Sequence, residues 1–256
     1  MTRFVQAPNL PKSKVKAGII SGENIKIIKL LESYGVTPIF TQKNVNIDNN
    51  ISNHADINIH HLGNNKFLTD STQNSPIQIL KKIHADVIES KEAVSGEYPF
   101  DCRLNFARIG DKLIGKAEIC DQLLKEYCNA NQIELINVHQ GYSKCSVCIV
   151  NERSIITDDQ AIKKAADAAG IDCLIVSKGD IRLNGYRYGF IGGASTLIDK
   201  NKLLFFGNLK AHTDYQDIIR FCQKYECDVV FDESFELTDV GGMIPVLEEV
   251  GDRKPD

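Results

Sequence analysis

The chain has 256 residues, of which 43% are hydrophobic and 25% are charged, and its formal net charge is −4. This composition predicts a globular protein with a sizeable core. A nucleic-acid partner is not expected without clustered Lys and Arg, and a membrane partner is not expected without an apolar run of about 20 residues. The first residues lack the apolar segment of a signal peptide, so a cytoplasmic location is expected.

Taken in chain order, the sequence repeats one pattern of predicted elements. A short strand leads through a tight turn to a second strand, then to a helix, and then to a β-branched strand. The first copy has only the strand "VKAGIIS", the helix "GENIKIIKLLESYG" and the strand "VTPIFT", with no opening hairpin. The five copies span residues 15–42, 53–90, 98–138, 142–177 and 188–232.

The fourth copy shows the pattern most clearly. "KCSVCIV" and "SIIT" are its predicted hairpin strands, "DDQAIKKAADAAG" is its helix and "IDCLIVS" is its last strand. Thr157 is expected to cap the helix and Gly170 to end it. Regular repeats of this kind predict one closed architecture.

A closing segment at residues 235–249, "FELTDVGGMIPVLEE", follows the fifth copy. It is expected to return to the first copy and supply the missing hairpin strand, which would remove exposed sheet edges. The prediction is a five-fold pseudo-symmetric α/β propeller of ββαβ repeats, in a single domain over residues 1–256. A doubly wound parallel sheet is the alternative, but the extra hairpin strands and the lack of a Gly-x-Gly-x-x-Gly or P-loop motif argue against it.

Aligning the copies on their first strands places Asp56, Asp101, Cys145 and Gly193 at equivalent positions. The spacings are 101 − 56 = 45, 145 − 101 = 44 and 193 − 145 = 48 residues. These side chains are therefore expected to converge on the axis of the ring.

The repeat rhythm, with phrases such as "YPFDCRLNFARIGDKLI" and "GYRYGFIGGASTLID", resembles the pentein superfamily over roughly residues 15–248. This superfamily contains arginine and agmatine deiminases, dimethylarginine dimethylaminohydrolases and amidinotransferases, and also the non-catalytic ribosome anti-association factors. The resemblance implies a five-fold α/β propeller with a site in a central channel. It also implies that Asp56 and Asp101 point toward that channel.

The usual catalytic residues of the superfamily are not found at the matching positions. Its hydrolases carry a nucleophilic Cys on the closing strand in a Gly-Gly-x-His-Cys-like setting, but here Gly241 and Gly242 are present and Ile244 and Pro245 stand where the His-Cys step would fall. The fourth repeat, where the superfamily has a His-x-Asp pair, reads "SKCSVCIV". Guanidine hydrolysis by the usual machinery is therefore not expected.

The pair Cys145 and Cys148 is the single Cys-x-x-Cys among eight cysteines. A structural zinc site needs a second pair of ligands, and none is visible. On a strand, residues three apart point to opposite faces, so this pair is expected to place Cys145 at the axis and Cys148 in packing. Cys145 is interpreted as a relocated nucleophile or, alternatively, as a second small packed residue.

The predicted site combines one thiol with acidic and basic side chains. Cys145 would attack, His54 or His139 would move protons, and the predicted ligand-binding positions are Asp56, Asp101, Asn58, Arg103, Gly192 and Gly193. Strand alternation puts His54, Asp56, Asn58 and His60 on one face, which would also suit a metal, but no metal or cofactor is predicted. The acidic residues could instead pair with Arg103 or Lys144, and the glycines could serve only tight packing.

The sequence thus predicts a protein that binds a small cationic or guanidino-like ligand. Thiol-dependent C–N hydrolysis or amidino transfer is the activity that these residues would support. A non-catalytic interaction module with the same fold is the alternative.

Overall fold

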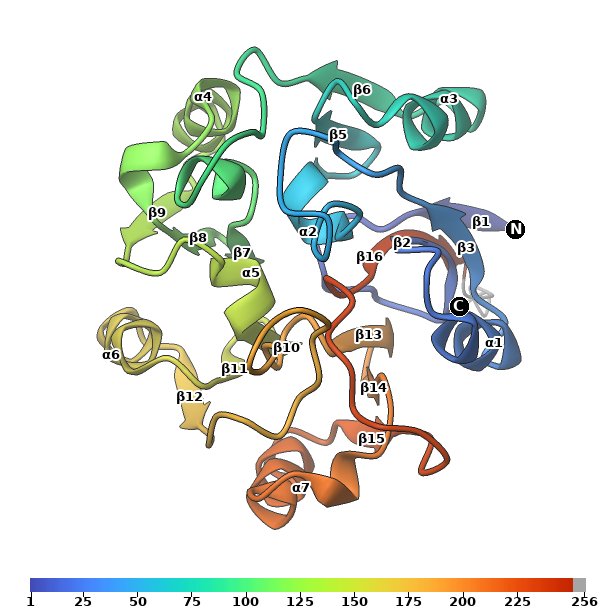
Figure 1. The fold of residues 1–256 in the computed structure, drawn as a ribbon, viewed down its shortest axis with the longest axis vertical. Helices are drawn as coiled ribbons and strands as arrows, with labels where there is room; N and C mark the ends of the chain where they lie inside the picture. Colours follow the sequence, from blue (N-terminus) through green and yellow to red (C-terminus); the bar gives the residue numbers. More distant parts are fainter. Residues whose placement is uncertain (251–256) are drawn as a thin grey trace, which may run out of the picture.

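Five small β-sheets surround a central axis (Figure 1). The computed structural model describes residues 1–250, so residues 251–256 of the predicted domain lie outside the described residues. In four of the sheets the first two strands are antiparallel and the last two are parallel. Their strands are β4 Ile59–Gly63, β5 Lys66–Thr69 and β6 Asp86–Glu89; β7 Ala107–Ile109, β8 Lys112–Gly115 and β9 Glu134–Asn137; β10 Val147–Asn151, β11 Ser154–Thr157 and β12 Asp172–Ile175; and β13 Ser195–Asp199, β14 Lys202–Phe205 and β15 Asp228–Val230.

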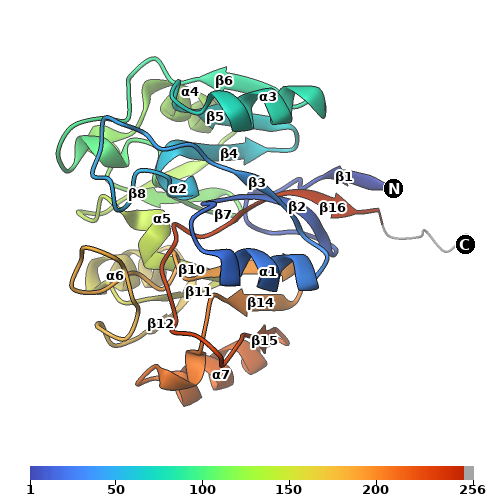
Figure 2. The same ribbon diagram turned by 45° about the vertical axis from the view of Figure 1, so that its right-hand side comes forward.

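The first sheet is completed by the C-terminal strand, as the sequence predicts. Its order is β1-β16-β2-β3, where β16 pairs antiparallel with both β1 and β2. Its strands are β1 Thr2–Phe4, β2 Val15–Ile20, β3 Thr37–Phe40 and β16 Ile244–Glu249. The two ends of the described chain therefore lie side by side, and the predicted five-fold propeller is confirmed (Figures 1 and 2).

The longer helices lie on the outside of the ring and cover the sheets (Figure 1). They are α1 Ile25–Ser33, α3 Asn74–Lys82, α4 Gln122–Ala130, α6 Gln160–Ala168 and α7 Tyr215–Lys224, with 3-10 turns η1 Phe100–Cys102, η2 Ala117–Ile119 and η3 Leu209–Ala211. The predicted cap of α6 is wrong: Asp159, not Thr157, accepts hydrogen bonds from the first free amides. Thr157 is instead the last residue of β11, where its hydroxyl donates to the carbonyl of Ser146.

Two short helical turns lie near the axis, where the sequence predicts strands. They are α2 Ala55–Asn58 and α5 Ser143–Ser146, and each leads directly into the first strand of its unit. Because a helical turn does not alternate its side chains between two faces, the predicted common face of His54, Asp56, Asn58 and His60 does not exist. The first strands begin later than predicted, at Ile59 and Val147.

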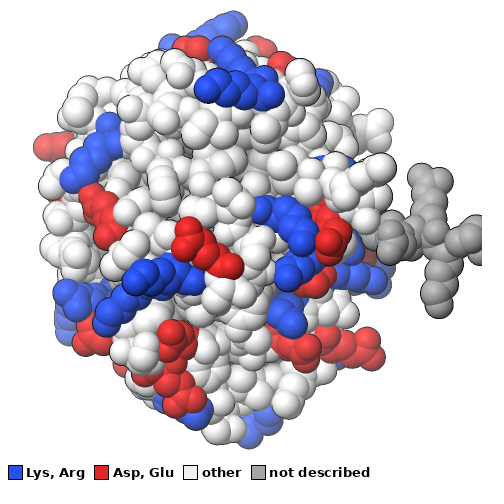
Figure 3. Space-filling view, turned by 90° about the vertical axis from the view of Figure 1, so that its right-hand side faces the viewer, with Lys and Arg blue, Asp and Glu red and all other residues white. Residues whose placement is uncertain are grey.

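All eight cysteines are free and buried, in agreement with the prediction of small core residues. Cys148 packs into the apolar cluster that also holds Cys222 and Cys227, whereas Cys145 packs with Ile57 and Leu104. Among residues 1–250, no helix is both long and apolar enough to cross a bilayer. On the face drawn in Figure 3, Lys and Arg are interspersed with Asp and Glu, which matches the absence of a basic stripe in the sequence.

Candidate active site

The helical turns that precede the first strands build the centre of the ring. His54, Tyr142 and Phe190 each stand five residues before the first residue of β4, β10 and β13, respectively. All three line one cavity of about 240 Å³. Structurally equivalent positions of three units therefore meet there.

The strand starts show that the sequence alignment of the repeats was out of register at Asp56. Cys145 and Gly193 both lie two residues before their strands, but Asp56 lies three residues before β4. The position equivalent to Asp56 is Lys144 in the fourth unit and Gly192 in the fifth. The helical turns α2 and α5 end directly before their strands in both units, so the true register between these units is 147 − 59 = 88 residues, one fewer than the 145 − 56 = 89 residues used in the sequence alignment.

Cys145 lines the cavity and is only 2% exposed. Its Sγ donates to Oδ2 of Asp56 at 3.0 Å and accepts from Nδ2 of Asn105 at 3.2 Å. Burial, and then the negative charge of Asp56, raise the pKa of the Cys145 thiol well above its usual value. In this arrangement the sulfur carries its proton and shares it with a carboxylate.

Asn105 holds the two turns together from the third unit. Its Oδ1 accepts from the amides of Lys144 and Cys145, and its Nδ2 also donates to the backbone carbonyl of Asp56. The side chain is fully buried. Asn105 therefore fixes the distance between the thiol and the carboxylate.

Asp56 is buried, and only one of its two carboxylate oxygens accepts a hydrogen bond from the described residues. Its Oδ1 has no hydrogen-bond partner among the described residues, whereas Oδ2 accepts from Cys145. Burial raises the pKa of Asp56 to about 6, while the positive charge of Lys144 acts in the opposite direction. A carboxyl group with such a pKa can accept and return a proton near neutral pH.

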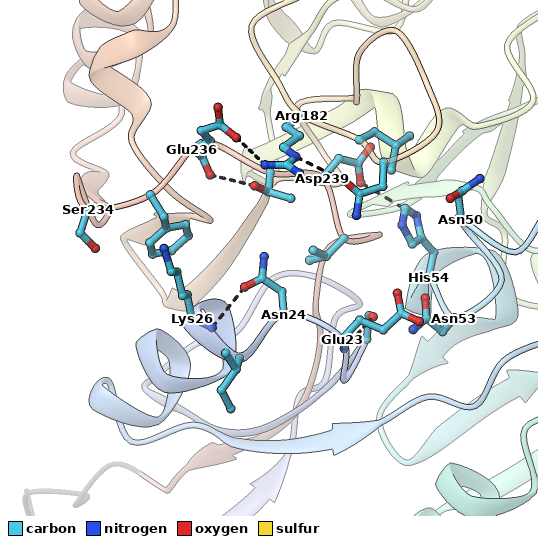
Figure 4. Close-up of a pocket in the computed structure, with 17 residues that line it drawn as sticks. Glu23, Asn24, Lys26, Asn50, Asn53, His54, Arg182, Ser234, Glu236 and Asp239 are labelled. Atoms are coloured by element: carbon cyan, nitrogen blue, oxygen red, sulfur yellow. Dashed lines mark hydrogen bonds and ion pairs between the residues drawn. The ribbon is translucent and has the colours of Figure 1, made fainter.

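His54 faces Asp239, which comes from the segment before β16 (Figure 4). The distance from His54 Nδ1 to Asp239 Oδ1 is 3.9 Å, and both side chains are buried. Asp239 is held by the amides of Phe190 and Gly241, at 2.8 and 2.9 Å. A ring nitrogen of His54, a carboxylate oxygen of Asp56 and Sγ of Cys145 all lie within 4.8 Å of one another.

Aromatic rings form much of the cavity wall. Tyr142 and Phe190 have centroids 6.3 Å apart, and Tyr188 meets Phe190 edge to face at 6.4 Å. The hydroxyl of Tyr142 donates to the buried carboxylate of Asp101. Aromatic faces beside carboxylates form an environment that attracts organic cations.

A second, larger hollow of about 580 Å³ meets the first at His54, Leu183 and Asp239 (Figure 4). Its wall carries both positively and negatively charged side chains, including Arg182 and Glu236, which form an ion pair at 2.7 Å. His54 and Asp239 therefore line both the cavity of about 240 Å³ and this larger hollow.

A sequence profile described as a family of unknown function, DUF6873, matches residues 19–244. The chain belongs to this family. Among curated proteins, no sequence match was found for this DUF6873 chain.

Solved structures with the same fold cover nearly the whole DUF6873 chain. An inosamine-phosphate amidinotransferase from Streptomyces griseus has a TM-score of 0.60 and 8% identity, and the match covers 95% of this chain and 97% of that one. The amidinotransferase SxtG from Microseira wollei, of a saxitoxin biosynthetic pathway, has a TM-score of 0.55 and 11% identity over 92% and 96%. Agmatine deiminase from C. jejuni has a TM-score of 0.52 and 10% identity over 91% of each chain. These matches confirm the pentein resemblance at the level of the fold.

Three of the predicted site residues of this DUF6873 chain do not line the cavity. Arg103 forms an ion pair with Glu92 and stacks on Phe100. His139 is exposed, and its backbone carbonyl accepts from Tyr98. Asp101 does not line the cavity but anchors Tyr142, which does.

The remaining predicted residues have structural roles. Asn58 donates to the carbonyls of Ser52 and His54, so it fixes the loop that carries His54. The amide of Gly193 is already bonded to the carbonyl of Cys145. A Cβ on Gly193 would lie 1.9 Å from Asp239 Oδ1, and one on Gly192 would lie 2.3 Å from the carbonyl of Val147. The glycines therefore allow close packing, and the amide of Gly193 is not free to bind a ligand.

Sequence reasoning missed Asn105, Tyr142, Tyr188, Phe190 and Asp239. Tyr142 and Phe190 could have been found from their common offset to the first strands. Asp239 precedes Gly241 and Gly242, and this acidic residue before a glycine pair was the available signal. Asn105 carries no local signal, because its role depends on two turns distant in sequence.

Proposed function

We propose that the central cavity binds a small ligand with a guanidinium or amidinium group, and that Cys145 attacks the central carbon of that group. The observation that carries this proposal is the meeting of a thiol, a carboxylate and an imidazole within 4.8 Å beside a cavity. Nucleophile, proton acceptor and proton donor are the three groups that such chemistry requires. The fold shared with amidinotransferases and agmatine deiminase is a second, weaker support.

The ligand class follows from the cavity wall. Tyr142, Tyr188 and Phe190 offer aromatic faces, and Asp239 offers a buried carboxylate at the same cavity. A planar cation fits both, because it can stack on rings and donate in-plane hydrogen bonds to carboxylate oxygens. The cavity of about 240 Å³ suits a small molecule rather than a polymer.

The resting thiol is protonated, so the ligand must take part in its activation. A bound cation beside Sγ favours the thiolate and thus lowers the pKa of Cys145. The proton moves to Asp56 Oδ2, which already accepts it at 3.0 Å. Since binding and ionisation are linked, the sulfur becomes nucleophilic only with its substrate present.

The reaction then balances in two halves. Thiolate attack forms a C–S bond, the C–N bond breaks, and the leaving nitrogen takes a proton from His54 or Asp56. Water attacks the S-bound carbon, the C–S bond breaks and the thiol is regenerated, so that a guanidinium and water give a ureido carbonyl and ammonium. With an amine in place of water, the amidino group is transferred instead.

The test is turnover of a panel of guanidino compounds, including arginine, agmatine and N-methylated arginines, with detection of ammonia, alkylamine and ureido products. Cys145→Ser should abolish turnover. Cys148→Ala is the matched control, since it removes a buried thiol of the same segment that packs in a different cluster, and it should retain turnover. No turnover by the wild type, or equal turnover by Cys145→Ser, would refute the catalytic proposal.

Binding without turnover is the alternative, and two observations favour it. The position of the usual nucleophile is taken by Ile244 and Pro245 in β16, and the pKa of Cys145 is raised. In that case guanidino compounds should raise the melting temperature of the wild type and of Cys145→Ser alike, with no product formed. The eight unpaired cysteines suggest action in a reducing compartment such as the cytoplasm.

A further inference from the structure

Three buried side chains place three kinds of metal donor at the centre of the ring. The nitrogen, oxygen and sulfur atoms come from His54, Asp56 and Cys145, and each pair of donors lies within 4.8 Å. Two of these residues come from the second unit and one from the fourth, so the tertiary fold brings them together. No pattern of ligand spacing in the sequence would reveal such a site.

We propose that His54, Asp56 and Cys145 bind a thiophilic divalent cation of the Zn²⁺ type. In a tetrahedral zinc site, sulfur and oxygen ligands lie roughly 3.5 Å apart. Sγ of Cys145 and Oδ2 of Asp56 are 3.0 Å apart, so a small outward movement would admit the ion as the thiol proton leaves. Imidazole, carboxylate and thiolate together are a donor set that prefers Zn²⁺ or Co²⁺ to Mg²⁺ or Ca²⁺.

Three further observations support this site independently of the donor spacing. Oδ1 of Asp56 is buried and has no hydrogen-bond partner among residues 1–250, so the carboxylate has an unused oxygen for an ion. Asp239 Oδ1 lies 3.9 Å from His54 Nδ1, too far for a hydrogen bond in this structure but on the side of the imidazole where a carboxylate could orient it after a small movement. Asn105 donates to Cys145 Sγ, as second-layer donors do to metal thiolates.

The surroundings leave one coordination position for an outside ligand. His54 and Cys145 line the cavity of about 240 Å³, so a fourth ligand can enter from there. Lys144 is the neighbouring cation; it lines a small cavity with Asp56, His60 and His61, whereas His54 and Cys145 line the larger one. Three protein ligands and an open position form an accessible zinc site rather than a closed structural one.

A metal at these atoms would occupy the lone pairs that the proposed thiol chemistry uses. We therefore infer, resting on the proposed function, that metal binding and attack by Cys145 exclude each other and that Zn²⁺ regulates the site by blocking it. Metal binding itself does not depend on the proposed function.

The direct test is titration of the full-length, chelator-treated protein with Co²⁺, followed by optical absorption. We expect one Co²⁺ per chain with a thiolate-to-cobalt charge-transfer band, and displacement of the band by Zn²⁺. Cys145→Ser should lose the band while keeping the fold, and Asp56→Asn and His54→Ala should weaken binding at least tenfold. Cys148→Ala is the control and should retain the band.

Absence of the band in the wild type, or its persistence in Cys145→Ser, would overturn the metal site. If guanidino turnover is found, Zn²⁺ should abolish it and a chelator should restore it, whereas stimulation by Zn²⁺ would overturn the regulatory inference. Metal binding without turnover would refute the proposed function and support the metal site. Turnover without metal binding would support the proposed function and refute the metal site.

Discussion

The helical turns before β4 and β10 each lead directly into the first strand of their unit, but they carry different chemistry. The first, over residues 54–58, carries an imidazole and a carboxylate, and the second, over residues 142–146, carries an aromatic ring, a lysine and a thiol. Asp56 and Lys144 stand at equivalent positions with opposite charge. A repeated scaffold can thus deliver complementary groups to one point, because these two copies reach the axis through helical turns at the same offset from their strands and carry different side chains.

The largest effect is expected in the fifth unit, where Gly193 stands at the position of Cys145. Gly193→Ala would place a Cβ 1.9 Å from a carboxylate oxygen of Asp239. We expect a loss of about 3 kcal/mol or more in the free energy of unfolding, because the segment before β16 must move. Chemical denaturation measures this loss.

Gly22→Ala is the matched control for Gly193→Ala. Its added Cβ would lie 3.2 Å from Phe40, whose side chain is partly exposed and can shift. A change below about 0.5 kcal/mol is expected. Equal losses in both variants would show that the fifth turn is not tightly constrained at the axis.

Asn105 is the physical link between the two compared turns. Asn105→Ala removes four hydrogen bonds and leaves the amides of Lys144 and Cys145 without their side-chain acceptor. We expect a loss of about 2 to 3 kcal/mol in the free energy of unfolding and faster alkylation of Cys145. The exposed Asn131 should lose less than about 0.5 kcal/mol on substitution by Ala, and a similar loss at both sites would contradict the bridging role.

The strand that follows the first of these turns, β4, carries a buried histidine, His61, that the corresponding strand β10 of the fourth unit lacks. Burial lowers the pKa of His61 to about 4, so the residue is protonated near pH 6.5 only in the unfolded state. Because the unfolded state then binds more protons, His61 destabilises the fold increasingly as pH falls from 6.5 toward 4. Arg108 adds to the shift, and the carbonyl of Asn64 opposes it.

His61→Asn should therefore gain stability relative to the wild type as pH falls through this window, by up to about 1.4 kcal/mol per pH unit. Denaturation midpoints at several pH values measure the difference. Asp56 and Asp158, whose pKa values burial raises to about 6, act in the opposite direction but are present in both proteins. A difference that does not change with pH would show that His61 does not stay neutral in the fold.

The smallest effects are expected at two residues that the sequence predicts in the site but that do not line the cavity in the structure. Arg103→Ala and His139→Ala should leave the affinity for guanidino compounds unchanged within twofold, since neither residue lines the cavity. Calorimetric or thermal-shift titration measures this affinity. A tenfold loss in either variant would place the binding site elsewhere.

The fold was largely predictable from sequence, because each unit has its own strand, turn and helix signals. The site was predictable only in part. Cys145 and Asp56 were identified, but strand alternation was applied to α2 and α5, where a helical turn replaces it. The contacts of Asn105 and Asp239 depend on closure of the ring, and no local pattern encodes them.

The most direct measurement concerns the reaction of Cys145 with two halides of nearly equal size. Chloroacetamidine carries the cationic amidine, chloroacetamide is its neutral counterpart, and in each case a thiolate displaces chloride. Peptide mass spectrometry after exposure should find Cys145 modified by the amidine at least tenfold faster than by the amide, with Cys148 unmodified. Equal rates with both reagents, or no adduct at Cys145, would contradict the claim that a bound cation activates this thiol.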